Sequence, residues 1–247
     1  MENTTYVALS SQAALWRQLE VVANNMANAN TPAYKGEEVM FTDYLVKSKS
    51  ANTPFGVNVA YVQDIGTLRD TREGPLTKTS DPLDVALHGD GYFVIDTPAG
   101  QRYSRSGHFR LDENGMMVTA AGYPVLQSND TPIVFAPNEA SIEIAGDGTV
   151  STENGMIGKM KVVRFANPQE LMSAGDSTYQ TDAQPITVER AAMTQGMLED
   201  SNVQPVVEMT KMMTILRNYQ NVQMMIQDEQ DRQLKAMPIL SSSQQKS

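Results

Sequence analysis

Cysteine is absent from the 247 residues of this chain, and basic residues are few. Without cysteine, disulfide bonds, thiolate metal sites and cysteine nucleophiles are excluded. The 19 Lys and Arg are outnumbered by 29 Asp and Glu, which gives a formal net charge of −10. A chain this acidic lacks the cationic face that binds nucleic acid or an anionic membrane surface. Neither is therefore an expected partner.

Long apolar runs are also missing. No window of 18 apolar residues occurs, so the sequence predicts no membrane-spanning helix and no stable membrane insertion. The opening residues, MENTTYVALSSQAALW, have neither the basic start nor the apolar stretch of a secretory signal, so no cleaved signal peptide is expected. Methionine, by contrast, is frequent at 16 residues, and its accumulation after residue 208 sets the C-terminal end apart from the middle.

Two interleaved apolar series predict an N-terminal helix over about residues 5 to 29. Each series repeats every seven residues, and together they produce the alternating three- and four-residue spacing of a helix seam. Thr4 or Thr5 is expected to cap the helix, and Pro32 to stop it, because the residue before a proline avoids the helical region. The seam consists of Ala8, Leu15, Leu19, Val22, Met26 and Ala29.

A second, longer helix is predicted from about residue 205 to 237. Pro205 and Glu208 are typical of a helix start, and Pro238 is expected to end it. A helix of about 32 residues spans nearly 50 Å, which suits packing along other helices better than the core of a compact domain. Its apolar face consists of Met212, Ile215, Leu216, Tyr219, Val222 and Ile226, with Met209 and Met213 beside them.

Four asparagines crowd the end of the first helix, although asparagine is a poor residue for a helix interior. All four lie off the apolar seam, and their amides can both donate and accept hydrogen bonds. We interpret them as an assembly surface whose amides bridge subunits, and Asn30-Thr31-Pro32 as a joint that ends the helix and directs the chain into the first arm. The alternative is a frayed, polar helix end. They are Asn24, Asn25, Asn28 and Asn30, within the stretch ANNMANANTPAYK.

The middle of the chain carries short apolar runs typical of β-strands, several of them alternating with polar residues. Glycine-containing turns separate the runs and supply the positive φ that tight hairpins need. Short strands at about ten-residue intervals indicate an antiparallel β domain and not a βαβ sheet. The runs are 83–87, 92–96, 108–112, 123–127, 132–136, 141–145 and 159–165, and the turns lie at 89–91, 114–115, 147–148 and 154–155.

The predicted fold class is therefore α+β. We expect the long terminal axial helices to pair as a coiled-coil-like domain, with each other and with other copies, and to bracket an inserted antiparallel all-β domain. Polar, weakly periodic segments join the helices to the β domain and are expected to be extended. The predicted order is an N-terminal axial helix (1–35), an extended arm (36–75), the β domain (76–167), a return arm (168–200), and the C-terminal axial helix and tail (201–247).

Patterns that carry chemistry are not found. His88 and His108 lack the spacing of metal ligands, and neither a P-loop nor a G-x-S-x-G motif occurs. The stretch GDGYF (89–93) has no following helix, so it indicates a hairpin turn and not a phosphate loop. The sequence therefore predicts no catalytic residue, metal, cofactor or small-molecule substrate.

Four stretches resemble the bacterial flagellar rod and hook family. VVANNMANANTPAYK (21–35) is similar to its N-terminal signature, an Ala-Asn-Asn-x-Ala-Asn-x-x-Thr core followed by an aromatic-Lys pair, although Pro32-Ala33 stands where the family usually has a small residue and Gly. QGMLEDSNVQPVVEMTKMMTILRNYQ (195–220) is similar to the C-terminal signature, Gly-x-Leu-Glu-x-Ser-Asn-Val before the last helix. GPLTKTSDPLDVALHGDGYFVI (74–95) resembles the family's entry into its β domain. YSRSGHFRLDENGMMVTAAGYPVL (103–126) resembles the block that follows it.

The resemblance implies a non-enzymatic structural subunit of the flagellar basal-body rod, most similar to proximal-rod members, with distal-rod members second. It implies a place in the periplasmic drive shaft, export by the flagellar type III apparatus without a cleaved signal, and other copies and other rod proteins as partners. Two other classes stay open on the residues alone. One is a different helix-bracketed assembly protein, and the other is a hydrolase whose carboxylates converge only on folding.

Overall fold

The computed structural model describes residues 2–48, 57–137, 139 and 141–244, and these fall into two compact units. The helical unit comprises residues up to 27, 37–68 and from 204 onward, and the β unit comprises 28–36 and 69–203. The chain therefore passes between the units at four crossing points, after Ala27, Gly36, Leu68 and Val203. Each unit is described on its own.

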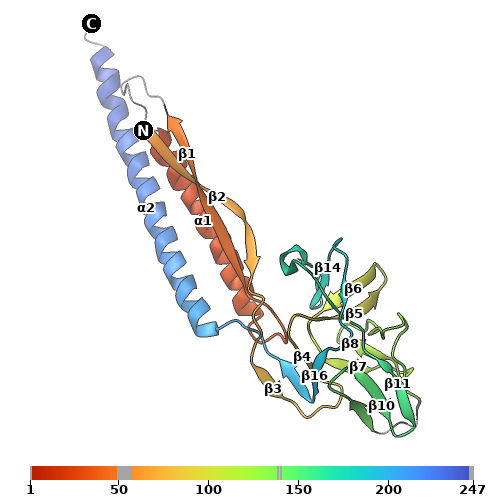
Figure 1. Cartoon of the computed structure of the whole chain (residues 1–247). Helices are drawn as coiled ribbons and strands as arrows, with labels where there is room; N and C mark the ends of the chain where they lie inside the picture. The colour runs from red at the N-terminus through yellow and green to blue at the C-terminus, as the bar shows by residue number, and fades with distance from the viewer. Residues whose placement is uncertain (1, 49–56, 138, 140, 245–247) are drawn as a thin grey trace. The chain divides into compact units, whose positions relative to one another are not determined.

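The helical unit consists of two helices and a two-stranded sheet. Helices α1 (Glu2–Ala27) and α2 (Pro205–Gln244) lie side by side and run in opposite directions (Figure 1). Strands β1 (Glu37–Ser48) and β2 (Val57–Arg69) pair with each other, and β1 lies against α1. The hairpin thereby covers one side of α1, while α2 covers another.

Both helices differ from the sequence prediction at their ends. Helix α1 begins at Glu2, so Thr4 and Thr5 lie inside it and the expectation that one of them caps it is wrong. Helix α2 continues to Gln244, so the expectation that Pro238 ends it is also wrong. A proline inside a helix removes one backbone hydrogen bond, but its own φ near −65° is helical, so the backbone can continue through it.

The segments 36–75 and 168–200, predicted as extended arms, contain more paired β-strands than their weak periodicity indicated. Most of the segment 36–75 is taken up by β1 and β2, and the segment 168–200 contains one 3₁₀ turn and five short strands. Four of these strands, β14 to β17, pair with strands outside the segment, which local periodicity does not reveal, and β13 pairs with β14. They are β13 (Met172–Ser173), β14 (Thr178–Gln180), β15 (Ile186–Thr187), β16 (Ala192–Gln195) and β17 (Met197–Glu199), and the turn is η1 (Pro168–Glu170).

The β unit is built on a six-stranded sheet with the strand order β13-β14-β6-β5-β12-β15, and its pairings are antiparallel, as predicted. Smaller sheets surround it: β3 pairs with β17, β4 with β16, β7 with β8, and β10 with both β9 and β11. The bounds not yet given are β3 (Leu76–Lys78), β4 (Val85–His88), β5 (Tyr92–Thr97), β6 (Gly100–Ser104), β7 (Phe109–Leu111), β8 (Met117–Thr119), β9 (Ile142–Ile144), β10 (Thr149–Thr152), β11 (Gly155–Lys159) and β12 (Val162–Arg164).

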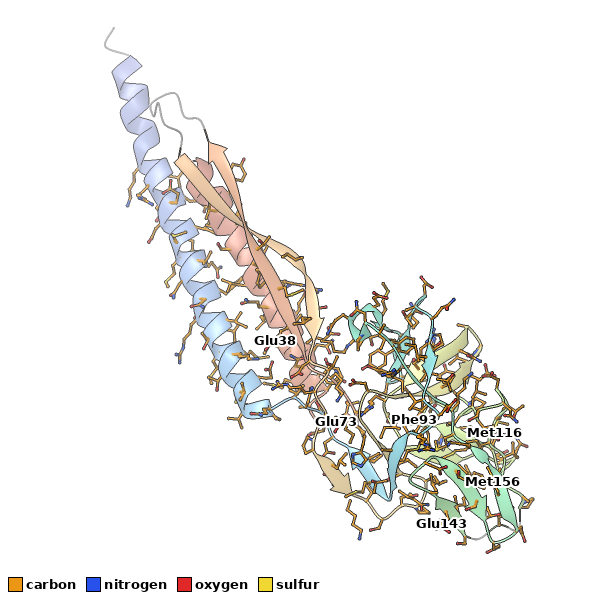
Figure 2. All side chains as sticks on the ribbon, viewed as in Figure 1. Glu38, Glu73, Phe93, Met116, Glu143 and Met156 are labelled. Atoms are coloured by element: carbon orange, nitrogen blue, oxygen red, sulfur yellow. The ribbon has the colours of Figure 1, made fainter. Side chains whose placement is uncertain are left out.

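Strand β5 supplies apolar side chains to two cores, because alternate residues of a strand point to opposite faces. Phe93 and Ile95 belong to the larger cluster, where Phe93 meets Phe109 edge to face at a ring distance of 5.1 Å (Figure 2 labels Phe93). Val94, on the other face, belongs to a second cluster with Tyr103 and residues of β12 and β14. All three β5 side chains are fully buried. The central position of this strand explains why its sequence, YFVIDT, is almost continuously apolar.

The predicted turns at 114–115, 147–148 and 154–155 join neighbouring antiparallel strands, β7 to β8, β9 to β10 and β10 to β11. The turn at 89–91 is present, but the expectation of a hairpin there is wrong, because β4 pairs with β16 whereas β5 pairs with β6 and β12. Gly89, Gly115 and Gly148 have φ of +74°, +76° and +88°, in the region that glycine adopts without a Cβ clash. At Gly115 a Cβ atom would also lie 2.3 Å from the carbonyl oxygen of Phe135, so the close backbone approach there requires glycine. The runs 123–127 and 132–136, predicted as strands, form only isolated bridges, in which single residues pair with single residues of other segments.

Candidate functional site: where the two signature motifs meet

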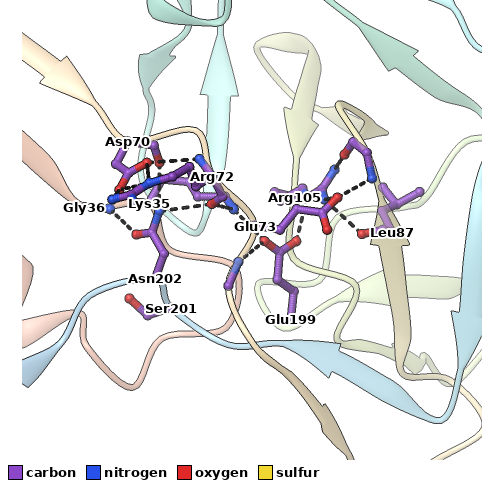
Figure 3. Close-up of polar contacts among 12 residues, drawn as sticks. Lys35, Gly36, Asp70, Arg72, Glu73, Leu87, Arg105, Glu199, Ser201 and Asn202 are labelled. Carbon is purple, nitrogen blue, oxygen red and sulfur yellow. Dashed lines mark hydrogen bonds and ion pairs between the residues drawn. The ribbon is translucent and has the colours of Figure 1, made fainter.

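The N-terminal and C-terminal signature motifs meet in a buried ion pair of the β unit. The Nζ of Lys35 lies 2.5 Å from Oε1 of Glu199, and Nε of Arg105 lies 2.7 Å from Oε2 of the same carboxylate (Figure 3). All three side chains are buried. The Gly74 amide also donates to Glu199 Oε1. One carboxylate is therefore held by two cations and a backbone amide, and it joins three segments far apart in the sequence.

This arrangement keeps Glu199 ionised. Burial by itself would raise its pKa, but the charge of Arg105 and the hydrogen bonds from Lys35 and Gly74 outweigh burial, and the pKa lies below its usual value. A buried charge is tolerated only where it is paired and hydrogen-bonded. The cluster of Lys35, Arg105 and Glu199, here named the signature ion cluster, satisfies this requirement.

Arg105 also binds the turn that follows β4. Its Nη1 donates to the carbonyl oxygens of Gly89 and Gly91 at 2.6 and 2.7 Å, and its Nη2 donates to that of Leu87 at 2.9 Å (Figure 3). The planar guanidinium can hold a carboxylate on one edge and carbonyls on the others. Arg105 therefore fixes the Gly89-Asp90-Gly91 turn to the signature ion cluster.

The side chain of Asn202 ties together three segments that lead to crossing points. Its Oδ1 accepts from the Gly36 amide at 2.8 Å, and its Nδ2 donates to the carbonyls of Asp70 and Arg72 at 2.9 and 3.1 Å. The Asp70 amide in turn donates to the carbonyl oxygen of Gly36 at 2.8 Å. Gly36, Asp70 and Asn202 each lie within two residues of a crossing point. We name these contacts the Asn202 clamp.

The segment after β2 is held at a second place in the β unit. The Arg69 amide donates to Gln169 Oε1 at 2.9 Å, and Gln169 Nε2 donates back to the Arg69 carbonyl at 2.8 Å, as a paired strand residue would. The Arg69 guanidinium donates to the Leu171 carbonyl and lies 4.7 Å from the ring centroid of Tyr179. These contacts give the segment a fixed path along the β unit.

The helical unit has its own buried asparagine at the end of α1. Asn25 is 3% exposed; its Oδ1 accepts from the Glu37 amide at 2.9 Å, and its Nδ2 donates to the Glu37 carbonyl at 2.8 Å and to Glu208 Oε2 at 3.2 Å. Glu208 is also paired with Lys211 at 2.8 Å. The hydrogen bond from Lys211 to Glu208 raises the pKa of the lysine above its usual value. Asn25 thus connects α1, the start of β1 and the first turn of α2.

The four predicted asparagines consequently differ in their surroundings. Asn25 is buried and makes these hydrogen bonds inside the chain. Asn28, in the β unit, is half-buried, and its Oδ1 accepts from the Thr31 hydroxyl at 3.2 Å. Asn24 and Asn30 are exposed. Their role at a subunit interface stays a prediction.

The predicted seams occupy the less exposed sides of both helices. On α1, Val22 is buried and Leu15, Leu19 and Met26 are half-buried. The helices are in contact, and the rings of Trp16 and Tyr219 lie 6.2 Å apart. On α2 the predicted residues Met212, Ile215, Tyr219, Val222 and Ile226 are half-buried, whereas Leu216 is 39% exposed.

Sequence reasoning missed the residues that hold the signature motifs together. Lys35, Glu199 and Asn202 stand inside the quoted motifs, but nothing local shows that they meet, and Arg105 lies in a separate block. Ala33 stands where the family usually has glycine; its φ is +57°, in the left-handed region that glycine favours, and its amide donates to the Glu199 carbonyl at 2.7 Å. The available signal was a charged residue in each motif, which becomes informative only once the two are placed together.

The described residues contain neither a metal-binding group of side chains nor a membrane-spanning helix. Within them, no three His, Asp or Glu side chains are grouped as they would be to hold a metal ion. In the same part of the chain, no helix has the length and apolar character needed to cross a membrane. His108, considered above as a metal ligand, has Nδ1 2.7 Å from Asp84 Oδ1, an ordinary side-chain pair.

Comparison of the sequence with known proteins shows the family to which the chain belongs. Three family models match the chain: "Flagella basal body rod protein" over residues 6–35, "Flagellar hook protein FlgE/F/G D1 domain" over 86–152, and "Flagellar basal body rod FlgEFG protein C-terminal" over 194–237. The first and third contain the signature motifs that meet at Lys35 and Glu199. The chain belongs to the flagellar hook and basal-body rod family.

The relatives narrow the position within that family. The flagellar basal-body rod protein FlgF of Caulobacter vibrioides is 39% identical over 92% of this chain and 93% of its own length. FlgF of Rhizobium meliloti is 34% identical over 98% of this chain and 100% of its own. FlgG of Bacillus subtilis is 31% identical over 90% of this chain and 92% of its own. The chain is a structural, FlgF-like subunit of the flagellar basal-body rod, and the family implies assembly there with other rod proteins.

Proposed function

We propose that this chain is a proximal-rod subunit that assembles, through its terminal helices, with other copies of itself and with other rod proteins. The single observation that carries the proposal is the matching of both terminal segments to rod families, with FlgF relatives covering nearly the whole chain. The amphipathic character of α1 and α2 supports it, because helices of this length gain most of their stability from burying an apolar face. The role is structural and not catalytic.

The proposed place is the periplasmic part of the basal body. The subunit would be exported unfolded by the flagellar type III apparatus, without a cleaved signal, and would join the drive shaft outside the cytoplasmic membrane. The lack of cysteine agrees with a periplasmic site, because it avoids oxidation to unwanted disulfides in an oxidising compartment.

Torque transmission requires that each unit resist deformation. In the helical unit, α1 and α2 are in contact along their length. Shear between them is resisted because it would have to disrupt many packed contacts at the same time. In the β unit, the Asn202 clamp and the signature ion cluster hold the segments that lead to the crossing points at fixed spacing. Polar networks whose members are all satisfied are rigid and geometrically specific.

Gene deletion with complementation tests the proposal. Deletion should leave cells non-flagellated and non-motile, with basal bodies that stop before the distal rod, and the wild-type gene supplied in trans should restore swimming. The purified basal bodies should contain the chain. Flagella of normal length in the deletion strain would rule out a rod role for this protein.

A distal-rod role is the second candidate, and the similarity to FlgG of Bacillus subtilis over 90% of the chain favours it. The two differ in which proteins fail to assemble after deletion. If the chain is a proximal-rod subunit, distal-rod protein should be missing from the basal bodies of the deletion strain. If it is the distal-rod protein, the proximal rod should persist without it.

A further inference from the structure

The β unit contains a cavity of about 440 Å³. It is lined by residues of β4, the turn 89–91, β12 and the connection from β15 to β16. Part of this lining is apolar, since it includes the buried residues Leu87, Gly91 and Val162. Cavities of about 300–1,000 Å³ that combine an apolar lining with a few polar groups are typical of small-molecule sites. The cavity is therefore large enough to hold a small molecule.

Hydrogen bonds hold two walls of this cavity in place. In the first wall, the Arg105 guanidinium donates to three carbonyl oxygens of β4 and the turn 89–91 (Figure 3). In the second, the connection from β15 to β16, the Glu189 carbonyl accepts from Nζ of Lys159 at 2.8 Å. A site whose walls are fixed before a ligand arrives loses less conformational entropy on binding. The cavity is preorganised in this sense.

Four charged side chains line the cavity, and all are exposed to solvent. Arg164 follows Val162 by two positions in β12, so the two lie on the same face of the strand. Within the part of the chain that the structure describes, none of the four charged groups makes a hydrogen bond or an ion pair. The four residues are Asp90, Arg164, Glu189 and Arg190.

The free arginines contrast with the other cations beside β12. Lys161 pairs with Asp130, and Lys159 pairs with Asp147 at 3.4 Å. The chain has a net charge of −10, so carboxylates are in excess. Two guanidiniums that nevertheless have no carboxylate partner at one cavity favour an anionic group supplied from outside.

The balance of charges around the cavity defines the ligand. A guanidinium binds a carboxylate through two parallel N–H donors, and a carboxylate accepts hydrogen bonds from an ammonium group. A purely anionic ligand would be attracted by Arg164 and Arg190 but repelled by Asp90 and Glu189. A ligand with groups of both signs can pair with all four side chains, while its carbon chain covers the apolar lining.

We propose that this cavity binds a free peptide of two or three residues that carries both carboxylate and ammonium groups. Arg164 and Arg190 hold its carboxylates, and Asp90 and Glu189 hold its ammonium groups. At about 30 Å³ per water-sized group, the volume admits roughly fifteen atoms heavier than hydrogen, which fits a short peptide and not a folded segment. The site goes beyond the proposed rod role and does not depend on it.

Calorimetric titration of the purified full-length chain near neutral pH tests the site with the dipeptide L-glutamyl-L-lysine, which offers two carboxylates and two ammonium groups. One dipeptide per chain is expected to bind. Arg164→Gln and Asp90→Asn should each weaken binding by about three- to fivefold, as the loss of an exposed ion pair does. The matched control Arg110→Gln removes an exposed arginine of β7 outside the cavity and should leave the affinity unchanged. All three positions are exposed, so the variants should keep the wild-type melting temperature.

Three further probes distinguish the kinds of ligand. Succinate carries only carboxylates and cadaverine only ammonium groups, and each should bind more weakly than the dipeptide by about fivefold or more. The dipeptide with an acetylated N-terminus and an amidated C-terminus keeps only the side-chain charges that a protein segment would present, and it should also bind more weakly.

The proposal would be overturned by any of three results. These are no binding of the dipeptide, equal binding of succinate or of the blocked dipeptide, and unchanged affinity in Arg164→Gln. The titrations need no assembled rod, so each of these results leaves the rod function intact. Normal flagella in the deletion strain would overturn the rod function alone.

Discussion

The ammonium group of Lys35 lies 2.5 Å from the carboxylate of Glu199, although 164 positions separate the two residues in the sequence. Both side chains are buried, and each stands in one of the two signature motifs. The family's two terminal signatures are therefore, in part, two halves of one contact within the β unit. This relationship gives the charges of Lys35 and Glu199 in the two motifs a structural reason.

Replacing the shared carboxylate should be costly. In Glu199→Gln the charge of Lys35 remains buried without this counter-ion, and Arg105 keeps only the more distant Glu73 carboxylate at 3.8 Å. Removing one partner of a buried pair costs about 3–5 kcal/mol. Urea unfolding, followed by a probe in the β unit, should show this loss. The control Glu189→Gln removes an exposed carboxylate outside the cluster and should change the free energy of unfolding by less than about 0.5 kcal/mol. Equal stability of the two variants would contradict the role given to the cluster.

Acid should weaken the wild-type β unit more than it weakens the Glu199→Gln variant. The folded-state pKa of Glu199 lies below its ordinary value, so its stabilisation is fully present above the unfolded pKa of about 4.3 and is lost as the pH falls through the lower folded pKa. Between about pH 6 and pH 3, the free energy of unfolding should therefore fall more steeply for the wild type than for Glu199→Gln. Other depressed carboxyls, such as Asp70, titrate in both proteins and cancel in the comparison. Parallel pH profiles would argue against a depressed pKa at Glu199.

The amide of Asn25 should be needed for the start of β1. Asn25→Ala leaves the Glu37 backbone and one Glu208 oxygen without these hydrogen bonds, and an unsatisfied buried polar group costs about 1–3 kcal/mol. Hydrogen exchange should become faster at the Glu37 amide. Asn221→Ala, on the exposed side of α2, is the control and should leave that amide protected. Unchanged exchange at Glu37 would show that Asn25 does not hold the strand.

A charge in the seam between the helices should act on folding as well as on assembly. Leu19→Asp places a carboxylate on the side of α1 that includes buried Val22, and the helical unit should lose helicity in far-ultraviolet circular dichroism and fail to enter the rod. Leu9→Glu, at a position of α1 that is 47% exposed, should keep full helicity. If Leu19→Asp supports normal motility, the seam assignment is wrong.

Local sequence was enough to predict the elements whose cause is local. The three- and four-residue spacing placed both helices and the sides they bury, and Gly89, Gly115 and Gly148 marked turns whose positive φ the structure confirms. Helix ends were predicted less well, because Thr4 and Pro238 are compatible with either a helix end or a helix interior. Amphipathic spacing also showed that these helices need partners, without showing which side meets which partner.

What only the tertiary structure decided is the pairing of distant residues. Nothing near Lys35 predicts Glu199, and nothing near Asn25 predicts Glu208, because each contact depends on how segments more than 160 positions apart are brought together. The segment 168–200 likewise contains strands that pair with distant ones, such as β16 with β4 and β17 with β3, and local periodicity does not reveal these partners. The sequence by itself determined the helices, the antiparallel β domain and the family, since those follow from periodicity, turn chemistry and motifs. The structure decided which asparagine is buried and which carboxylate holds the motifs together.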